Sequence, residues 1–413
     1  MKQLLCIAYY FPPQGGGGVQ RVAKFVKYLP QFGWQPTVLT GAASASVLDP
    51  SLSSDVPPST RVVRVRGWVF PSSWPWRLRH WLKRWWLVVD EQIGWLPFAV
   101  REGLALLHRQ TWDAIYSTSA PYTDHLVGLR LKRASQLPWV ADFRDPWIDN
   151  FSVQFATPLH RALCARLEQE IVRTADRVLV VSEPMRQQFL ARHPQRAAHH
   201  IITLPNGFDP ADFEGVEPAT RDARFTLVYT GSLYGPQSAG SFLEAVSSLL
   251  ERGIIPRSSL CVRFVGNTGQ ETAQWVTRWQ LGGVVELLGY LPHAQTIAHQ
   301  LAADLLVLII GSGPGSESVL TAKLFEYLAC GKPILALIPP GAAADLLLEA
   351  GVGWMVPPDE PEAIATALAA LFADWQQGRL QATPDPLVVA RYNRQRQTAK
   401  LAHLLDGLGD ERW

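Results

Sequence analysis

The sequence predicts an α/β protein made of two Rossmann-like domains, and three observations support this class. The chain has 413 residues, which is too long for one hydrophobic core and suits two domains of about 200 residues. Short apolar runs that suit buried strands alternate with helical patterns, and the alternation restarts after residue 224. Glycine-rich loops at residues 15–18 and 311–315 each join an apolar run to a helical pattern. Such alternation is typical of parallel sheets with helices on both faces.

The composition is that of a globular protein and narrows the classes of function. Hydrophobic residues make up 47% and charged residues 18% of the chain, which is far from a disordered composition. The formal net charge of +2 argues against a general nucleic-acid binder. No run reaches 18 apolar residues, so no membrane-spanning helix is expected. Four cysteines lie among apolar residues without a CxxC pair, which predicts buried thiols in a reducing cytosol: Cys6, Cys164, Cys261 and Cys330.

The first half opens with an apolar run at residues 4–10, four consecutive glycines and a helical pattern from Val19. Residues 1–13 lack the cleavage site of a leader peptide, so we expect them to contain the first strand. Small residues at a strand-to-helix turn let backbone N–H groups approach an anion at the positive end of the helix. Four consecutive glycines do not make the GxGxxG fingerprint of dinucleotide sites, and a tight turn without a ligand is the open alternative.

The rest of the first half continues the alternation. The expected strands are 36–40, 61–65, 113–117, a strand from 139, and 176–182; the expected helices are 97–109, 123–135, 163–173 and 184–192. The strand from Trp139 ends in charges, at Asp142, Arg144 and Asp145. Ligands of open α/β sheets bind at the carboxyl ends of strands. These charges therefore form either a structural ion-pair cluster around Arg144 or a site where Asp145 or Asp142 contacts acceptor hydroxyls or a sugar.

Residues 67–89 contain six of the sixteen tryptophans. At about 100° per residue, one side of a helix over residues 74–89 carries Leu78, Trp81, Leu82, Trp85, Trp86 and Val89. The basic residues fall on the other side: Arg77, Arg79, His80, Lys83 and Arg84. Such a helix suits a membrane interface with anionic lipid. A tryptophan-rich core helix with a solvated basic face is the open alternative.

The second half begins after a linker at residues 206–224, which follows a Pro-Asn-Gly turn at 205–207. Strands are expected near 226–229, 261–265, 284–288 and 305–310, and closing helices at 361–372 and 387–405. Between 305 and 338 the pattern is strand, glycine loop, helix and strand, with Ser316 or Ser318 as the expected helix cap and Gly331 as its end. This helix carries a cation, Lys323, and a carboxylate, Glu326, three residues apart.

Residues 323–333, KLFEYLACGKP, resemble the nucleotide-sugar-binding helix of family 4 retaining glycosyltransferases. The resemblance implies the GT-B fold, in which two Rossmann-like domains face each other across a nucleotide-sugar cleft. It also implies that Glu326 holds the ribose. Relatives place a second glutamate eight residues earlier, where this chain has Ser318, with Glu317 one residue out of register. They also place an arginine and a lysine where this chain has Ser232 and Gln237.

The resemblance implies domains at 1–205, on the acceptor side, and 206–390, on the donor side, with 391–413 crossing back to the first domain. It implies catalytic roles for Lys323, Glu326 and Asp145, and a phosphate contact for Arg21. The sequence shows no DxD motif or histidine cluster, so no metal and no separate cofactor are expected. The expected nucleotide-sugar contacts are Gly16, Gly17, Gly18, Arg21, Gly231, Ser232, Asn267, Tyr290, Ser316, Ser318, Lys323 and Glu326.

The sequence therefore predicts a retaining glycosyltransferase that moves a sugar from a nucleotide-sugar donor to a glycan or lipid-linked acceptor in bacterial cell-surface polysaccharide assembly. We expect a cytoplasmic protein, at the inner face of the cell membrane if residues 74–89 bind lipid. A nucleotide-sugar epimerase of the same fold is one alternative. A catalytically dead sugar-nucleotide-binding protein is another, because the first glutamate and both phosphate cations are missing. A nicotinamide oxidoreductase fits poorly because the second strand lacks an acid for the ribose.

Overall fold

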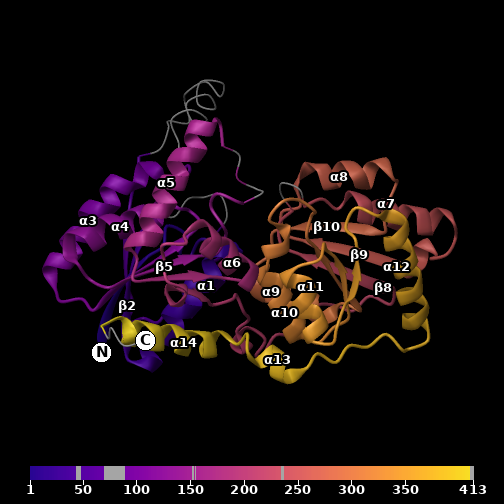
Figure 1. Ribbon diagram of the computed structural model, residues 1–413. Helices are drawn as coiled ribbons and strands as arrows, with labels where there is room; N and C mark the ends of the chain where they lie inside the picture. The colour runs from indigo at the N-terminus through magenta and orange to yellow at the C-terminus, as the bar shows by residue number, and fades with distance from the viewer. Residues whose placement is uncertain (43–47, 69–88, 151–152, 154, 234–236, 410–413) are drawn as a thin grey trace. The chain divides into compact units, whose positions relative to one another are not determined.

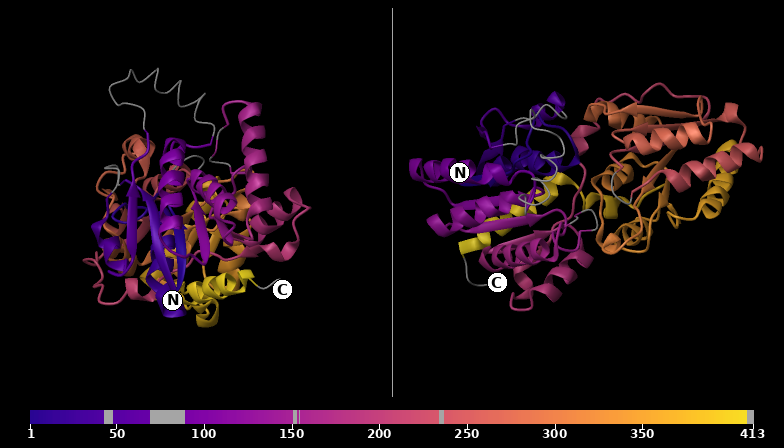
Figure 2. Two further views of the ribbon diagram at one scale, coloured as in Figure 1. Left: turned by 90° about the vertical axis from the view of Figure 1, so that its left-hand side faces the viewer. Right: turned by 90° about the horizontal axis from the view of Figure 1, so that it is seen from above.

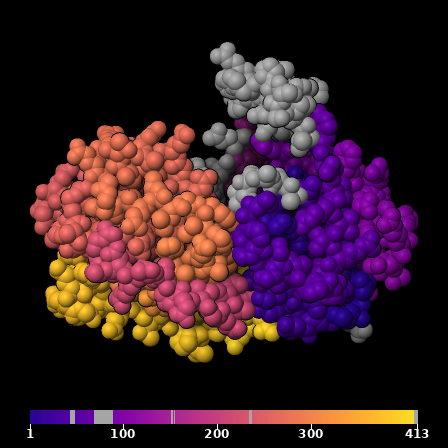
Figure 3. Space-filling view, turned by 180° about the vertical axis from the view of Figure 1, so that it is seen from behind, coloured from indigo at the N-terminus to yellow at the C-terminus, as the bar shows by residue number. Residues whose placement is uncertain are grey.

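The computed structural model describes the chain except residues 43–47, 69–88, 151–152, 154, 234–236 and 410–413. It divides into two compact units. The first unit consists of Met1–Pro205 together with Arg394–Trp413, and the second is Asn206–Asn393. Each unit has a closely packed surface (Figure 3). None of the helices in the described residues combines the length and low polarity that crossing a lipid bilayer requires.

The first unit contains a seven-stranded parallel sheet with the strand order β3-β2-β1-β4-β5-β6-β7. The strands are β1 (Lys2–Ile7), β2 (Trp34–Gly41), β3 (Arg61–Val65), β4 (Ala114–Ser119), β5 (Trp139–Phe143), β6 (Arg177–Val180) and β7 (Ile201–Thr203). The helices are α1 (Gly17–Tyr28), α3 (Leu96–Arg109), α4 (Thr123–Ser135), α5 (Pro158–Thr174), α6 (Glu183–Arg192) and α14 (Arg394–Asp406) (Figure 1).

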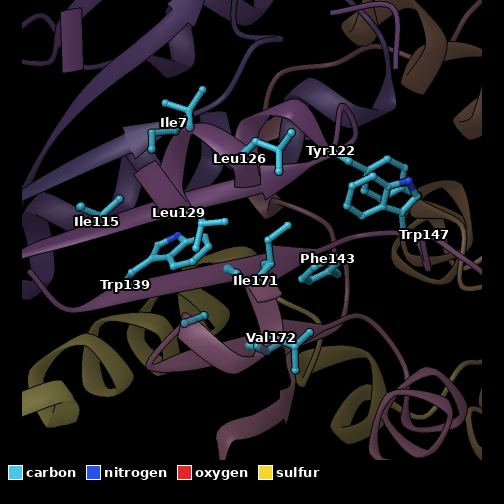
Figure 4. Packing of buried hydrophobic residues seen from close by; sticks show 14 of the residues in the cluster. Ile7, Ile115, Tyr122, Leu126, Leu129, Trp139, Phe143, Trp147, Ile171 and Val172 are labelled. Carbon is cyan, nitrogen blue, oxygen red and sulfur yellow. The ribbon is translucent and has the colours of Figure 1, made fainter. Parts of the chain in front are cut away.

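Alternation along the strands builds a core on each face of this sheet. In β1, Leu5 and Ile7 join the cluster under α3, α4 and α5, where Trp139 and Ile171 also pack (Figure 4). Leu4 and Cys6 point to the opposite face and pack with α1 and α14. A strand that is buried on both faces carries a continuous apolar run, which is why residues 4–10 were recognisable as a strand.

The second unit contains a six-stranded parallel sheet with the order β10-β9-β8-β11-β12-β13. The strands are β8 (Phe225–Thr230), β9 (Leu260–Val265), β10 (Val285–Gly289), β11 (Leu305–Ile309), β12 (Ile334–Leu337) and β13 (Trp354–Val356). The helices are α7 (Gly240–Glu251), α8 (Gly269–Arg278), α9 (His293–Ala302), α10 (Ala322–Cys330), α11 (Ala342–Glu349), α12 (Pro361–Gln376) and α13 (Pro386–Ala390). Helices α7 and α12 cover one face, and α10 and α11 cover the other.

Two predicted helices have different bounds in the structure. The expected helix 387–405 is divided into α13 and α14, and the boundary between the two units falls in this interruption. The helix expected after Ser316 starts only at Ala322, because Ser316–Ser318 forms a separate 3-10 turn. Gly331 ends α10 in the left-handed conformation, with φ 63°, as predicted. The four cysteines are free thiols, of which Cys330 is only partly buried.

Helix α14 completes the core of the first unit. Leu401 and Leu405 are buried with residues of β1 and α1. Near its end, Asp406 accepts hydrogen bonds from Lys2 Nζ, at 2.7 Å, and from Trp34 Nε1, at 3.1 Å. Figure 2 shows α14, in yellow, lying along the first unit in both views. The last residues of the chain therefore stabilise the fold of its first residues.

Replacing Leu401 with alanine should lower the free energy of unfolding of the first unit by about 2–5 kcal/mol, the usual cost of removing a fully buried leucine side chain. Urea unfolding followed by hydrogen exchange of β1 and β2 measures this change. The matched control is Lys400→Ala on the exposed side of α14, which should stay within about 0.5 kcal/mol of the wild type. Equal stability of the two variants would contradict the packing of α14 on this unit.

Candidate functional site

The strand order of the second unit creates a crevice at the carboxyl ends of its strands. The chain leaves β8 toward β9 and β10 on one side, and it continues from β11 toward β12 and β13 on the other. Loops that leave two neighbouring strands in opposite directions open such a crevice, and open α/β sheets bind ligands there. The loop after β8 begins with Gly231, and the loop after β11 contains Gly311, Gly313 and Gly315. Both predicted glycine turns of this unit therefore lie at the crevice.

Glycine is required at the ends of β8 and β9 because the two turns touch. Gly231 and Gly266 have φ values of 105° and 127°, which favour glycine. A Cβ atom on Gly266 would lie 2.2 Å from the carbonyl oxygen of Gly231. The Gly231 N–H donates to the carbonyl of Val265 at 2.8 Å, and the Gly266 N–H donates to that of Gly289 at 2.7 Å. The ends of β8, β9 and β10 are thus held side by side.

Lys323 reaches from the first turn of α10 to the end of β8. Its Nζ atom donates to the hydroxyl of Tyr229 at 2.6 Å and lies 4.1 Å from the centre of the Tyr229 ring. A Cβ atom on Gly231 would be 3.0 Å from Lys323 Cε, so the lysine side chain lies directly against this turn. Part of the side chain reaches solvent, yet burial of the ammonium lowers the pKa of Lys323 to about 7, against the opposing effect of the Glu326 carboxylate.

Glu326 lies one turn further along α10 and is 8% exposed. His293 Nε2 donates to its Oε1 atom at 3.0 Å, and Gln300 Nε2 donates to its Oε2 atom at 3.0 Å. Gln300 is fully buried and also donates to Thr230 Oγ1 at 3.2 Å. The carboxylate therefore joins α9 and α10 to the end of β8.

The contacts of His293 and Gln300 with Glu326 were not predicted from the sequence. The only available signal is their spacing of seven residues, which places both on one face of a helix. Nothing in the sequence shows that this face of α9 packs beside α10. The contact depends on the tertiary structure alone.

The serines predicted as helix caps hold the loop before α10 instead. Ser318 is buried and donates from Oγ to the carbonyl of Gly315 at 2.8 Å, and Ser316 is 9% exposed. The residue before α10 is Thr321, whose buried Oγ1 atom has no hydrogen-bond partner in the described part of the chain. The prediction that Ser316 or Ser318 caps α10 is therefore wrong, because both serines lie in a 3-10 turn that residues 319–321 separate from the helix.

The other predicted contacts of the second unit have different surroundings. Ser232 and Asn267 are exposed, and Tyr290 is 41% exposed on the loop before α9. Asn267 Oδ1 accepts from the N–H of Gly269 at 3.2 Å, which stabilises the turn after β9. Gln237 is 7% exposed. The two positions at which relatives place cations are therefore one exposed serine and one buried glutamine.

In the first unit, Arg21 is buried in an ion pair. Its Nε and Nη2 atoms each donate to one oxygen of Asp142 at 2.8 Å. Its remaining donors reach the carbonyls of Leu204 and Pro205, both at 2.9 Å. Burial alone would raise the pKa of Asp142, but the charge and hydrogen bonds of Arg21, with a hydrogen bond from Tyr116, bring that pKa below its ordinary value. We therefore assign Arg21 a structural role and no longer propose it as a phosphate contact.

Arg144 supports the first glycine loop and does not pair with Asp142. Its guanidinium donates to the carbonyls of Ser119, Ala120 and Gly18. A Cβ atom on Gly18 would lie 2.6 Å from Arg144 Nη1, so the guanidinium would have to shift to make room for any other residue. Gly16, with φ 107°, precedes α1, and the helix begins at Gly17. Asp145 is exposed after the end of β5. Of the charges that were predicted to form one cluster, Asp142 is fully buried, Arg144 is partly exposed and Asp145 is exposed, although desolvation raises the pKa of the Asp145 carboxyl above its ordinary value.

One group of side chains in the second unit has the spacing of a metal site. Asp222, Cys261 and Glu286 offer ligand atoms within 4.8 Å of one another. The carboxylates are already paired with arginines: Asp222 contacts Arg224 at 2.6 Å, and Glu286 contacts Arg263 at 2.8 Å. Two cations in contact with the acids disfavour a third, so we propose no metal here.

The fold and the site define a class of nucleotide-binding α/β proteins, and comparisons with known proteins identify the family. The profile described as "Glycosyl transferase 4-like domain" matches residues 16–207, and the profile described as "Glycosyl transferases group 1" matches residues 224–374. Together they cover most of the chain, which belongs to the family 4 glycosyltransferases of the GT-B fold. Among curated proteins, no sequence matches the chain.

Solved structures agree with this fold over nearly the full length of the chain. HepE from Anabaena, in complex with UDP and glucose, is 17% identical with a TM-score of 0.69, and the match covers 98% of this chain and 100% of that one. WaaG, a glycosyltransferase involved in lipopolysaccharide biosynthesis, is 14% identical with a TM-score of 0.62, covering 98% and 100%. A putative UDP-N-acetylglucosamine 2-epimerase from Listeria monocytogenes is 12% identical with a TM-score of 0.60, covering 100% and 98%. At these identities the likeness establishes the fold and not the reaction.

Replacing Arg21 with methionine should destabilise the first unit by about 3–5 kcal/mol, because it leaves the Asp142 carboxylate buried without its cation. Chemical denaturation measures the loss. Nucleotide affinity of the folded variant should stay at the wild-type value, because the guanidinium is buried and already paired with Asp142. A stable variant with weaker nucleotide binding would instead return Arg21 to the phosphate site.

Proposed function

We propose that the chain is a retaining glycosyltransferase that binds the nucleotide part of its donor at the crevice of the second unit. The observation that carries this proposal is the placement of Lys323 and Glu326 on one side of α10, beside the glycine turn after β8. The ammonium suits the diphosphate and the carboxylate suits the ribose hydroxyls. The separation of about one helical turn matches the distance between these two parts of a nucleotide.

The reaction breaks the bond between the anomeric carbon and the diphosphate oxygen and forms a bond to an acceptor oxygen. The leaving nucleoside diphosphate gains negative charge as the bond breaks. Preorganised cations and N–H donors at that point lower the barrier because they interact more strongly with the transition state than with the ground state. In our proposal Lys323 supplies the cation and the 311–321 loop supplies N–H donors, apart from those of Ser316, Ser318 and Val319, which already donate to carbonyls within the loop. This arrangement needs neither a divalent metal nor a separate cofactor.

The acceptor and the cellular role are proposals from the sequence. Asp145, exposed after β5, is our candidate for contact with an acceptor hydroxyl, and Gly16–Gly18 for contact with the donor sugar. The similarity to WaaG, a glycosyltransferase involved in lipopolysaccharide biosynthesis, supports a glycan or lipid-linked acceptor in bacterial polysaccharide assembly. Nearly all of the tryptophan-rich segment, residues 74–89, lies outside the described residues. Its contact with anionic lipid at the inner face of the membrane stays a prediction, which co-sedimentation with anionic vesicles at rising salt would test.

The pH dependence of nucleoside diphosphate affinity should report the protonation state of Lys323. In the free protein the pKa of Lys323 is about 7, and the bound diphosphate raises it because it favours the charged ammonium. The affinity for the diphosphate therefore has its full value below pH 7. Above pH 7 it should fall by up to about tenfold per pH unit, until the pH reaches the raised pKa of Lys323 in the complex. Calorimetric titration between pH 7 and 9 measures this slope. Lys323→Met should bind weakly with a flat profile, and a flat profile in the wild type would remove Lys323 from the site.

The reaction class is tested by product analysis with a panel of nucleotide sugars. A ligand at about 100 times its Kd stabilises the protein by about 2.7 kcal/mol, so a thermal-shift screen selects the donor. With that donor and an acceptor, we expect nucleoside diphosphate and a glycoside of unchanged anomeric configuration, with full activity in EDTA. Conversion of the donor without an acceptor would indicate the epimerase alternative. Binding without any turnover would indicate the catalytically dead protein, and an inverted product would contradict retention.

A further inference from the structure

At the crevice of the second unit, the Lys323 ammonium is paired with the hydroxyl of Tyr229. Lys323 is the only lysine or arginine between Val307 and Gly331. The positions of the two cations of relatives are Ser232, which is exposed, and Gln237, which is buried. In this chain Lys323 is therefore the cation beside the turn after β8, where the resemblance implies two further cations in relatives. The position of its ammonium is correspondingly more important for binding a diphosphate.

Tyr229, the penultimate residue of β8, fixes that placement. Its hydroxyl accepts from Lys323 Nζ at 2.6 Å and donates to the carbonyl of Ser232 at 3.1 Å. The ring lies 4.1 Å from the same ammonium. An ammonium has three N–H donors. Tyr229 receives one of them, and the described residues contain no hydrogen-bond acceptor for the other two. The tyrosine thus orients the cation and leaves two of its donors for an anionic ligand.

Core packing explains the ring of Tyr229 but not its hydroxyl. The ring is fully buried and packs against Phe264 at 5.6 Å between ring centres, in a cluster that also contains Phe242. A phenylalanine would fill this space equally well. The hydroxyl extends past the apolar cluster to the end of the sheet, where it meets the lysine and the backbone of the turn.

We infer that Tyr229 is a positioning residue that holds the Lys323 ammonium and the Gly231–Ser232 turn in one geometry for the donor diphosphate. This inference rests on the proposed role of Lys323 as the diphosphate cation. A lysine side chain with four rotatable carbons otherwise samples many conformations, and ordering it in advance raises its effect on the transition state. The hydroxyl also favours the charged form of the lysine because it accepts a hydrogen bond from it.

The test is Tyr229→Phe, which keeps the ring and removes the hydroxyl. A hydrogen bond to a charged group corresponds to a factor of about 10–150, so kcat should fall within that range while KM for the donor changes less. The fall in nucleoside diphosphate affinity with pH should begin at a lower pH than in the wild type. Tyr392→Phe, the same change at a half-buried tyrosine of the same unit, is the control and should leave both readouts unchanged.

A double-mutant cycle with Lys323→Met separates this inference from its premise. If Tyr229 acts through Lys323, Tyr229→Phe has no further effect on affinity or turnover in the Lys323→Met background. An equal effect of Tyr229→Phe in both backgrounds would overturn the inference. A Tyr229→Phe single variant with wild-type turnover and pH profile would also overturn it. If Lys323→Met alone binds nucleoside diphosphate as tightly as the wild type, the proposed donor site itself fails. Melting temperatures of all variants show whether a loss comes from unfolding, and an unfolded Tyr229→Phe would assign the hydroxyl to stability and overturn the positioning role.

Discussion

The buried carboxylate of Glu326 is the interaction on which the geometry of the second unit depends. It binds His293 and Gln300 of α9, and Gln300 continues the network to Thr230 at the end of β8. A buried carboxylate needs such partners, because an unpaired one is strongly destabilising. The same bonds fix α10 against the strand ends, and from this position Lys323 reaches Tyr229. The network therefore places both the group we assign to the ribose and the group we assign to the diphosphate.

In the first unit the buried charges of Arg21 and Asp142 pair with each other and support the backbone. Arg21 and Asp142 satisfy each other, and the remaining donors of Arg21 hold the backbone after β7. Arg144 donates to the carbonyl of Gly18 in the glycine loop and to that of Ala120 after β4. Arg144 thus supports the glycine loop, and Arg21 supports the backbone after β7. Our proposal assigns the contact with acceptor or sugar to the exposed glycine loop and to Asp145.

The sequence was informative where the relevant residues are close together along the chain. The apolar runs predicted the strands because parallel strands are buried on both faces, and the spacing of Lys323 and Glu326 placed both on one side of a helix. It misled where the partner is distant. The family resemblance implied a phosphate contact for Arg21, and the sequence does not show that Arg21 pairs with Asp142, which lies 121 residues away. The serines at 316 and 318 have good capping chemistry, but the chain completes a separate turn before α10 begins. His293 and Gln300 gave no signal that they meet Glu326.

The most direct measurement of the central claim is a crystal structure of the chain with the nucleoside diphosphate that a thermal-shift screen selects. The account predicts diphosphate oxygens within hydrogen-bond distance of Lys323 Nζ, ribose hydroxyls at the Glu326 carboxylate, and the bond between Lys323 and Tyr229 retained. A nucleotide bound elsewhere in the second unit, or bound at the crevice with Lys323 turned away from the diphosphate, would contradict it.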